Sequence, residues 1–218
     1  MLGHPKLFPG YQAGSACFFD EMPPVYRQGE HYRDNWGCVW YNIQEGLEGI
    51  VVEHPLADWG ALDTYQPPDL LTKTERGERD WEQIRRSIEE ARKNGHLTGG
   101  DGERLFDRLY FLRGFDNLMM DIAGDDPHLP RLIAMLTDYE LRLVHKWLDI
   151  GVDLIGFHTD IGTQKALMIS PGKFRRYIKP MYMEVFQTCR RAGTHVCLSS
   201  DGRLLEIVDD LIECGVSM

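Results

Sequence analysis

The part of the chain after residue 96 alternates apolar segments with amphipathic helical patterns, and this alternation restricts the fold more than any other feature. The helical patterns cover residues 128–150, 171–192 and 203–214, and the apolar segments cover 152–157, 194–199 and 216–218. Apolar strands that alternate with helices are typical of parallel strands covered on both faces and joined by right-handed crossovers. We therefore predict an α/β fold.

Two architectures are built from such units, the doubly wound sheet and the eight-stranded barrel. No G-x-G-x-x-G turn follows a predicted strand, so a dinucleotide-binding sheet lacks its usual signature. A complete (β/α)8 TIM barrel needs about 250 residues. This chain offers three or four core strands in 218 residues. We predict an incomplete barrel of the TIM type over residues 71–218, in a chain truncated at both ends.

Residues 1–70 differ from the rest because Gly, Pro and aromatic residues are frequent there. We expect an N-terminal loop and hairpin segment of the barrel domain, with turn signals at 22–24. Residues 35–42 and 49–52 are predicted to form the antiparallel hairpin. Trp36 and Trp40 are its expected packing residues. After this segment the pattern predicts a helix over 75–94, a short strand over 96–98 and a helix or loop over 103–112.

Composition excludes several classes of partner. A formal net charge of -10 opposes binding to nucleic acid, which relies on clustered Lys and Arg. The cysteines contain no C-x-x-C pair and suit a reducing compartment; they are Cys17, Cys38, Cys189, Cys197 and Cys214. No segment approaches the ~20 apolar residues that cross a bilayer, and no signal peptide is recognisable. We expect a cytoplasmic protein that binds neither nucleic acid nor membrane.

Polar side chains follow two successive predicted strands at the points where the strands end. They are His158, Thr159, Asp160 and Gln164 after the first strand, and Ser199 and Asp201 after the second. Ligands of parallel α/β folds bind beyond the carboxyl ends of the strands. We therefore expect one shared opening, with Asp160 and Asp201 about one strand spacing of ~5 Å apart. The alternative is that both aspartates cap the following helices, although Ser170 and Pro171 already supply one such cap.

With these residues in place, the chain resembles the uroporphyrinogen decarboxylase superfamily, a family of eight-stranded α/β barrels that act on or beside tetrapyrroles. The resemblance rests on sequence blocks that recur in the same order, namely LRGFDN at 112–117, DIGTQ at 160–164, ISP at 169–171, YIKP at 177–180, SSDG at 199–202 and LIECGV at 211–216. It implies that Tyr110 positions the substrate and that Thr159 contacts a substrate carboxylate.

A second branch of that superfamily contains zinc-dependent methyltransferases, which move methyl groups between corrinoid proteins and thiols. These enzymes use an H-x-C motif at a strand end, where this chain has Ser199-Ser200-Asp201. Hydroxyl and carboxylate oxygens are harder ligands than imidazole and thiolate. We therefore assign no metal ligand and no cofactor.

The leading hypothesis is a uroporphyrinogen decarboxylase-like enzyme that acts on a tetrapyrrole or a related anionic small molecule. Asp160 and Tyr110 are its predicted catalytic residues, and Asp160 would stabilise a protonated pyrrole while CO2 departs. The predicted substrate-binding residues are His158, Thr159, Gln164, Ser199 and Asp201. The nearest candidate cations for an anionic substrate are Arg104, Arg108 and Arg113, although such arginines usually lie on a helix surface.

Two alternatives stay open. The first is a corrinoid-linked methyltransferase, which would work with a corrinoid protein as its partner. The second is an inactive fragment or a binding module that a partner completes, because an incomplete barrel exposes two strand edges. A homodimer formed through the hairpin and the aromatic N-terminal segment is a further possibility.

Overall fold

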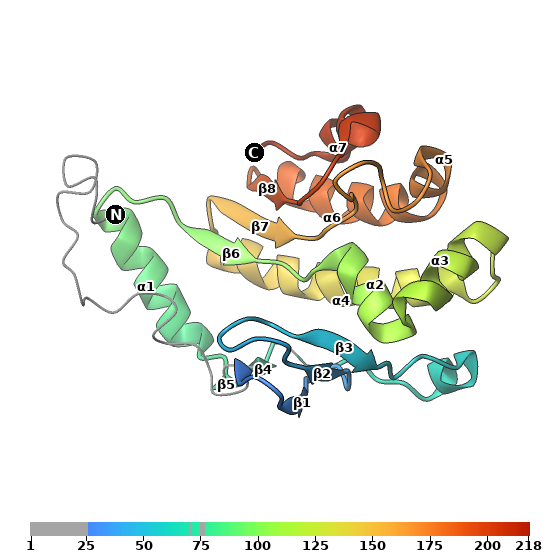
Figure 1. Ribbon diagram of the computed structural model, residues 1–218. Coiled ribbons are helices and arrows are strands. Elements are labelled where there is room, and N and C mark those ends of the chain that lie inside the picture. Colours follow the sequence, from blue (N-terminus) through green and yellow to red (C-terminus); the bar gives the residue numbers. More distant parts are fainter. Residues whose placement is uncertain (1–25, 70, 75–76) are drawn as a thin grey trace, which may run out of the picture.

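The computed structural model describes residues 26–69, 71–74 and 77–218, and Figure 1 shows their arrangement. An antiparallel sheet of order β1-β2-β3 comes first, formed by β1 (His31–Arg33), β2 (Val39–Tyr41) and β3 (Ile50–Glu53). This confirms the predicted hairpin. Trp36 and Trp40 are both buried, as expected. The turn signals at 22–24 and Cys17 lie outside the described residues.

A three-stranded parallel sheet forms the centre of the chain. Its order is β6-β7-β8, with β6 at Gly99–Asp101, β7 at Leu154–His158 and β8 at His195–Ser199. The backbone of residues 217–218 pairs with Val196 and Leu198 along the free edge of β8. The α/β class is confirmed. The described residues form small sheets and not a closed barrel, so the TIM-barrel type stays a prediction.

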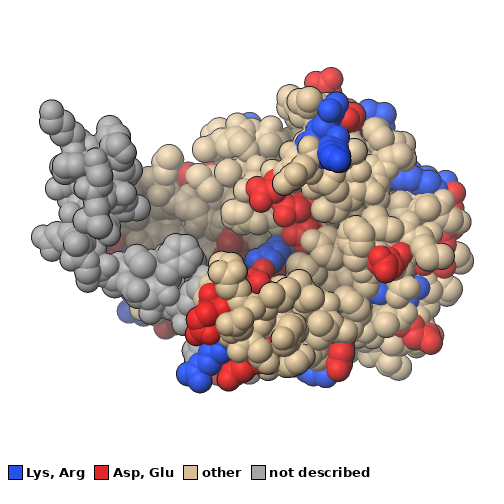
Figure 2. Space-filling view, viewed as in Figure 1, with Lys and Arg blue, Asp and Glu red and all other residues tan. Residues whose placement is uncertain are grey.

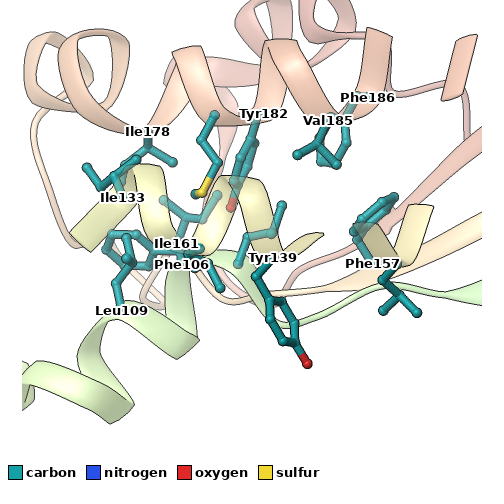
Figure 3. Packing of buried hydrophobic residues seen from close by; sticks show 14 of the residues in the cluster. Phe106, Leu109, Ile133, Tyr139, Phe157, Ile161, Ile178, Tyr182, Val185 and Phe186 are labelled. Carbon is teal, nitrogen blue, oxygen red and sulfur yellow. The ribbon is translucent and has the colours of Figure 1, made fainter. Parts of the chain in front are cut away.

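Two long helices cover one face of this sheet and lie behind it in Figure 1. They are α4 (Leu129–Ile150) and α6 (Lys179–Arg191), which contact each other. On β7 the buried side chains alternate, and the ring of Phe157 packs 4.8 Å from the ring of Phe186 on α6. Figure 3 shows this apolar layer between the strands and the helices. Each fully buried aliphatic or aromatic side chain here contributes roughly 2 kcal/mol.

The remaining elements connect these layers. They are the 3-10 helix Trp59–Asp63, β4 (Lys73–Thr74), β5 (Gly77–Glu78), α1 (Trp81–Lys93), α2 (Leu105–Arg113), α3 (Phe115–Gly124), α5 (Pro171–Lys173), the π-helical turn Phe174–Ile178, the 3-10 helix Leu205–Ile207 and α7 (Val208–Cys214). Among the described residues, none of the helices combines the length and the apolar character that crossing a bilayer requires.

Several predicted boundaries were wrong. The strand expected over 96–98 lies instead at β6, where the Gly-Gly sequence has little strand propensity and pairing with β7 fixes the conformation. Helix α1 begins later than predicted, because the Asp80 side chain caps it by accepting a hydrogen bond from the amide of Gln83. Helix α3 was not predicted. The predicted Ser170 cap is confirmed, since its hydroxyl accepts from the amide of Lys173.

The helix expected over 171–192 is not continuous. A π-helical turn over Phe174–Ile178 separates α5 from α6, and Pro180 lies in the first turn of α6. Proline lacks an amide proton and displaces the carbonyl of the preceding turn, so the wider π-helical turn accommodates it.

The loops after β7 and β8 approach each other through two glycines. A Cβ atom on Gly202 would lie 2.5 Å from the carbonyl oxygen of Gly162, and one on Gly162 would lie 2.7 Å from that of Arg203. The Arg203 amide donates to the carbonyl of Thr163 at 2.8 Å. Only glycine permits backbones to approach this closely. The glycines of the DIGTQ and SSDG blocks therefore hold the two loops together.

We predict that Gly202→Ala destabilises the chain by about 2 kcal/mol more than Gly193→Ala. Both glycines have a positive φ, 87° and 81° respectively, so both substitutions carry a similar backbone penalty of about 1 kcal/mol. Only Gly202 has backbone atoms in the path of the new Cβ, since Gly193 has nothing within 4 Å. Urea unfolding of the two variants measures the difference. Equal losses of stability would contradict the close loop contact.

Candidate functional site

The carboxyl ends of β7 and β8 lie side by side and bring their polar side chains together. The final pair in the register is His158 with Ser199. Beyond it, the Asp160 carboxylate accepts a hydrogen bond from the amide of Asp201 at 2.7 Å. The expectation that Asp160 and Asp201 lie on neighbouring strand ends is confirmed.

Helix α2 begins against the same opening, because the hydroxyl of Thr159 binds its first amides. The Thr159 Oγ1 atom accepts from the amide of Phe106 at 2.9 Å and from that of Asp107 at 3.2 Å. These amides belong to the first helical turn and have no partner within the helix. Thr159 itself is buried, with 2% of its surface exposed. The side chain of Thr159 therefore fixes where α2 starts.

Asp107, in the first turn of α2, is the buried carboxyl of this opening. Its Oδ1 atom accepts from the amide of Asp160 at 2.9 Å, and its carboxyl is hydrogen-bonded to the Tyr110 hydroxyl. Burial raises the pKa of Asp107 to about 6, although both hydrogen bonds act in the opposite direction; the charge of Asp160 adds to the rise and that of Arg104 opposes it. Asp107 therefore exchanges a proton close to neutral pH.

Tyr110 stays protonated beside this carboxyl. Burial raises the pKa of its hydroxyl far above the ordinary value, and the neighbouring charge and hydrogen bond of Asp107 raise it further. A phenol of this kind acts as a hydrogen-bond donor at neutral pH. The pair formed by Asp107 and Tyr110 thus holds one exchangeable proton on the carboxyl and one fixed proton on the phenol.

Among the residues that the structure describes, carboxylates predominate over free cations around the opening. Figure 2 shows acidic side chains gathered at the centre of the face, with a basic side chain among them, in the region where Figure 1 places the ends of β7 and β8. Arg104, which precedes α2, is paired with Glu48 at 2.5 Å. The opening therefore favours a neutral, protonated or positively polarised group over a bare anion.

The expectation that Arg108 and Arg113 lie on a helix surface was wrong. The Arg108 guanidinium is buried between Asp34 and Glu103, at 3.1 and 3.2 Å, and lies over the ring of Trp36. Arg113 is buried against Asp121 at 2.7 Å. Buried guanidinium groups need such partners because isolated charges are expensive to desolvate. Both arginines join α2 to its surroundings.

The structure brings some of the predicted site residues together and leaves others apart. Hydrogen bonds link Tyr110, Asp160 and Thr159 to Asp107, and Asp160 to the amide of Asp201. His158, Ser199 and the side chain of Asp201 are exposed at the rim, and Gln164 is exposed on the loop after β7. Their substrate-binding roles stay predictions.

Asp107 was missed by the sequence analysis. The signal was present in the run Leu105-Phe-Asp-Arg-Leu109, where two charged residues are surrounded by apolar ones. A charged residue within such a run must be buried and paired, or else exposed on a narrow polar face. Both charged residues are buried, Asp107 with 6% and Arg108 with 5% of their surface exposed.

The alternative that both aspartates cap the following helices is not supported. The 3-10 helix at Leu205 and α7 both begin without a side-chain cap, so Asp201 does not serve either helix. The carboxylate of Asp160 is bound to the amide of Asp201 on the neighbouring loop. Asp160 therefore joins two loops and does not cap a helix.

The donor set at the end of β8 does not suit zinc. Ser199, Ser200 and Asp201 offer only oxygen ligands, whereas zinc prefers nitrogen and sulfur. Within residues 26–69, 71–74 and 77–218, no three His, Cys, Asp or Glu side chains are grouped to hold a metal ion.

A separate hollow of about 330 Å³ lies at the amino ends of β7 and β8, opposite the opening. It is lined by residues that include Leu97, Asp153 and His195. His195 is the exposed first residue of β8, so it lies at the opposite end of this strand from Asp201.

Comparisons with known proteins add information on the fold. No protein-family model matches the chain, and no curated protein matches it. Solved structures do match, among them a methyltransferase from Methanosarcina mazei with a TM-score of 0.62 and 19% sequence identity. The match covers 84% of this chain and 52% of the methyltransferase, so the chain spans about half the length of that protein. At this level of identity the likeness shows a shared α/β fold.

We predict that Thr159→Val lowers the free energy of unfolding by about 2 kcal/mol, because two buried amides of α2 lose their acceptor. Thr159→Ser keeps the hydroxyl and removes one methyl group, so it should cost about 1 kcal/mol. Chemical denaturation of both variants measures the losses. A valine variant as stable as the serine variant would show that the hydroxyl does not hold α2.

Proposed function

We propose that this chain carries the carboxylate-lined part of an enzyme active site that acts on a small molecule by proton transfer and charge stabilisation. The observation that supports the proposal is the carboxyl of Asp107, which is buried at the ends of parallel strands and whose pKa is raised to about 6. Strongly shifted carboxyl groups at such positions are concentrated in active sites. Asp107, Tyr110 and Asp160 are its central residues.

Each of these residues has a distinct task. Asp107 gives a proton to the substrate or removes one, because it exchanges its proton near neutral pH. Tyr110 donates a hydrogen bond and holds the carboxyl of Asp107 in position. One oxygen of the Asp160 carboxylate accepts a hydrogen bond from the Asp201 amide. The negative charge of this carboxylate can stabilise positive charge on a bound molecule.

Decarboxylation is the reaction that this arrangement supports best. An acid near a pyrrole or a similar electron-rich ring protonates a ring carbon, and the cation formed accepts the electrons released as CO2 departs. Neighbouring carboxylates then stabilise that cation. This role agrees with the resemblance to uroporphyrinogen decarboxylases. The buried arginines argue for few carboxylates on the substrate, since Arg108 and Arg113 are already paired within the protein.

Methyl transfer is the second candidate, because the methyltransferase from Methanosarcina mazei has a similar fold over about half of its length. In that reaction Asp107 would accept the proton of a thiol or hydroxyl acceptor as the methyl group is transferred. The oxygen ligands at the end of β8 make a thiol-activating zinc unsuitable there. Of the two candidate reactions, only methyl transfer would require a corrinoid protein as the methyl donor.

We predict that Asp107→Asn and Asp160→Asn each lower turnover by at least ~100-fold, because each removes a charge or a proton that the reaction requires. CO2 release from a porphyrinogen and methylation of a thiol are the two activities to measure. The exposed Asp209→Asn on α7 is the matched control and should leave turnover unchanged.

The pH profile of turnover gives a second readout of the same prediction. If Asp107 acts as the acid, turnover falls as the pH rises through about 6, the pKa to which burial raises this carboxyl. The decline should be absent from the residual activity of Asp107→Asn. Wild-type turnover in both asparagine variants would contradict the proposed site.

A further inference from the structure

A second buried carboxyl, Glu140, lies outside the proposed site. It is located on α4, and none of its surface is exposed. Its Oε2 atom accepts a hydrogen bond from the amide of Glu103 at 3.0 Å, whereas Oε1 is buried without a hydrogen-bond partner. An ionised carboxylate rarely leaves a buried oxygen unpaired.

The surroundings of Glu140 favour the neutral acid. A Cβ atom on Gly102 would lie 2.9 Å from Oε1 and 2.3 Å from the ring of Phe157, so apolar and backbone groups pack tightly on the carboxyl. Figure 3 shows Phe157 in the apolar layer, with the Tyr139 hydroxyl directed away from it. This packing leaves little space for water to solvate a charge.

The charged and titratable groups around Glu140 do not supply a free cation. The groups that act on it from the neighbouring elements are Glu103, Asp101, Arg79, Tyr139 and Cys189. Arg79 is the basic member of this set, and it already pairs with Asp101 at 2.8 Å. Arg108 is likewise paired with Glu103 and Asp34. Among the described residues, Glu140 therefore has two acidic neighbours, and the charge of Arg79, which opposes their effect, is shared with Asp101.

We propose that Glu140 is buried as a neutral carboxylic acid, and that its ionisation at alkaline pH places a buried negative charge beside Glu103 and Asp101 and so loosens the Gly102–Arg104 turn. The carboxyl of Glu140 accepts a hydrogen bond from the amide of Glu103, and Glu103 is the central residue of the turn that joins β6 to α2. On deprotonation the proton passes to solvent, and the buried negative charge faces Glu103 and Asp101. Ionisation of Glu140 requires no substrate, so this behaviour is independent of the proposed function.

The sign of the pH effect follows from the two states. Burial raises the pKa of Glu140 from its ordinary value of 4.5 to about 8 in the folded chain. The hydrogen bond from the Glu103 amide and the charge of Arg79 oppose this rise, and the charges of Glu103 and Asp101 add to it. Between these values the unfolded chain has released the proton that the folded chain still holds. Stability therefore falls as the pH rises through this window, and the loss is complete above about pH 8.

Thermal unfolding of the wild type, Glu140→Gln and Asp138→Asn between pH 5.5 and 9 tests the proposal. Glutamine keeps the acceptor for the Glu103 amide and carries no charge, so its profile should be flatter. We expect the wild-type Tm to fall about 5 °C further than that of Glu140→Gln between pH 6 and pH 8. Asp138 is exposed on the same helix, and its asparagine variant should follow the wild type.

An NMR titration provides an independent measurement, with the wild type labelled with 13C at the glutamate carboxyl carbons. It tests the protonation state of Glu140 even if Glu140→Gln does not fold. One resonance should titrate near pH 8, and exchange of the Glu103 amide should accelerate above that pH beyond its intrinsic increase. Parallel Tm profiles for the wild type and Glu140→Gln, or midpoints below pH 6 for every glutamate, would overturn the proposal.

Discussion

The structure depends on a series of hydrogen bonds in which the end of each element holds the start of the next. The hydroxyl of Thr159, after β7, accepts hydrogen bonds from the first amides of α2. The carboxyl of Asp107 on α2 accepts one from the amide of Asp160, and the carboxylate of Asp160 accepts one from the amide of Asp201 after β8. In each of these bonds a backbone amide donates to a side-chain oxygen, so the loops are fixed while the exposed carboxylate of Asp201 at the rim stays available. The close contact of Gly162 with Gly202 completes the arrangement.

The same bonds explain why a carboxyl with an unusual proton affinity occurs at this place. Asp107 is buried because α2 begins directly behind the strand ends, and burial opposes its ionisation more strongly than two hydrogen bonds favour it. Nearby, the positive charges of Arg108 and Arg113 are enclosed in ion pairs that attach α2 to the N-terminal sheet and to α3. The opening is consequently acidic, and this supports chemistry on a protonated or electron-rich molecule more than recognition of a polyanion.

Periodicity predicted the parts of the fold in which one face or one whole strand is apolar. The strands at β7 and β8 and the helix at α4 follow this rule, and so does the meeting of Asp160 with Asp201. It did not predict β6, because Gly99 and Gly100 carry no apolar pattern. A glycine is required at position 100 because the indole of Trp147 leaves no space for a Cβ atom. It also missed the role of Asp107: the apolar residues beside it indicate burial, but its partners Thr159 and Asp160 lie more than fifty residues away. Such contacts between distant segments cannot be read from local sequence.

The strand ends enclose an aspartic acid, Asp107, whose carboxyl holds its proton up to about pH 6. This proton affinity is tested most directly by titrating the chain with 13C-labelled aspartate carboxyl carbons and assigning the Asp107 resonance by its absence from Asp107→Asn. The structure predicts a midpoint near pH 6 for Asp107, because burial raises the pKa of its carboxyl to about 6. A midpoint at or below about 4, the ordinary value for an aspartate, would show that Asp107 is ionised and solvated, and would contradict the account of the site.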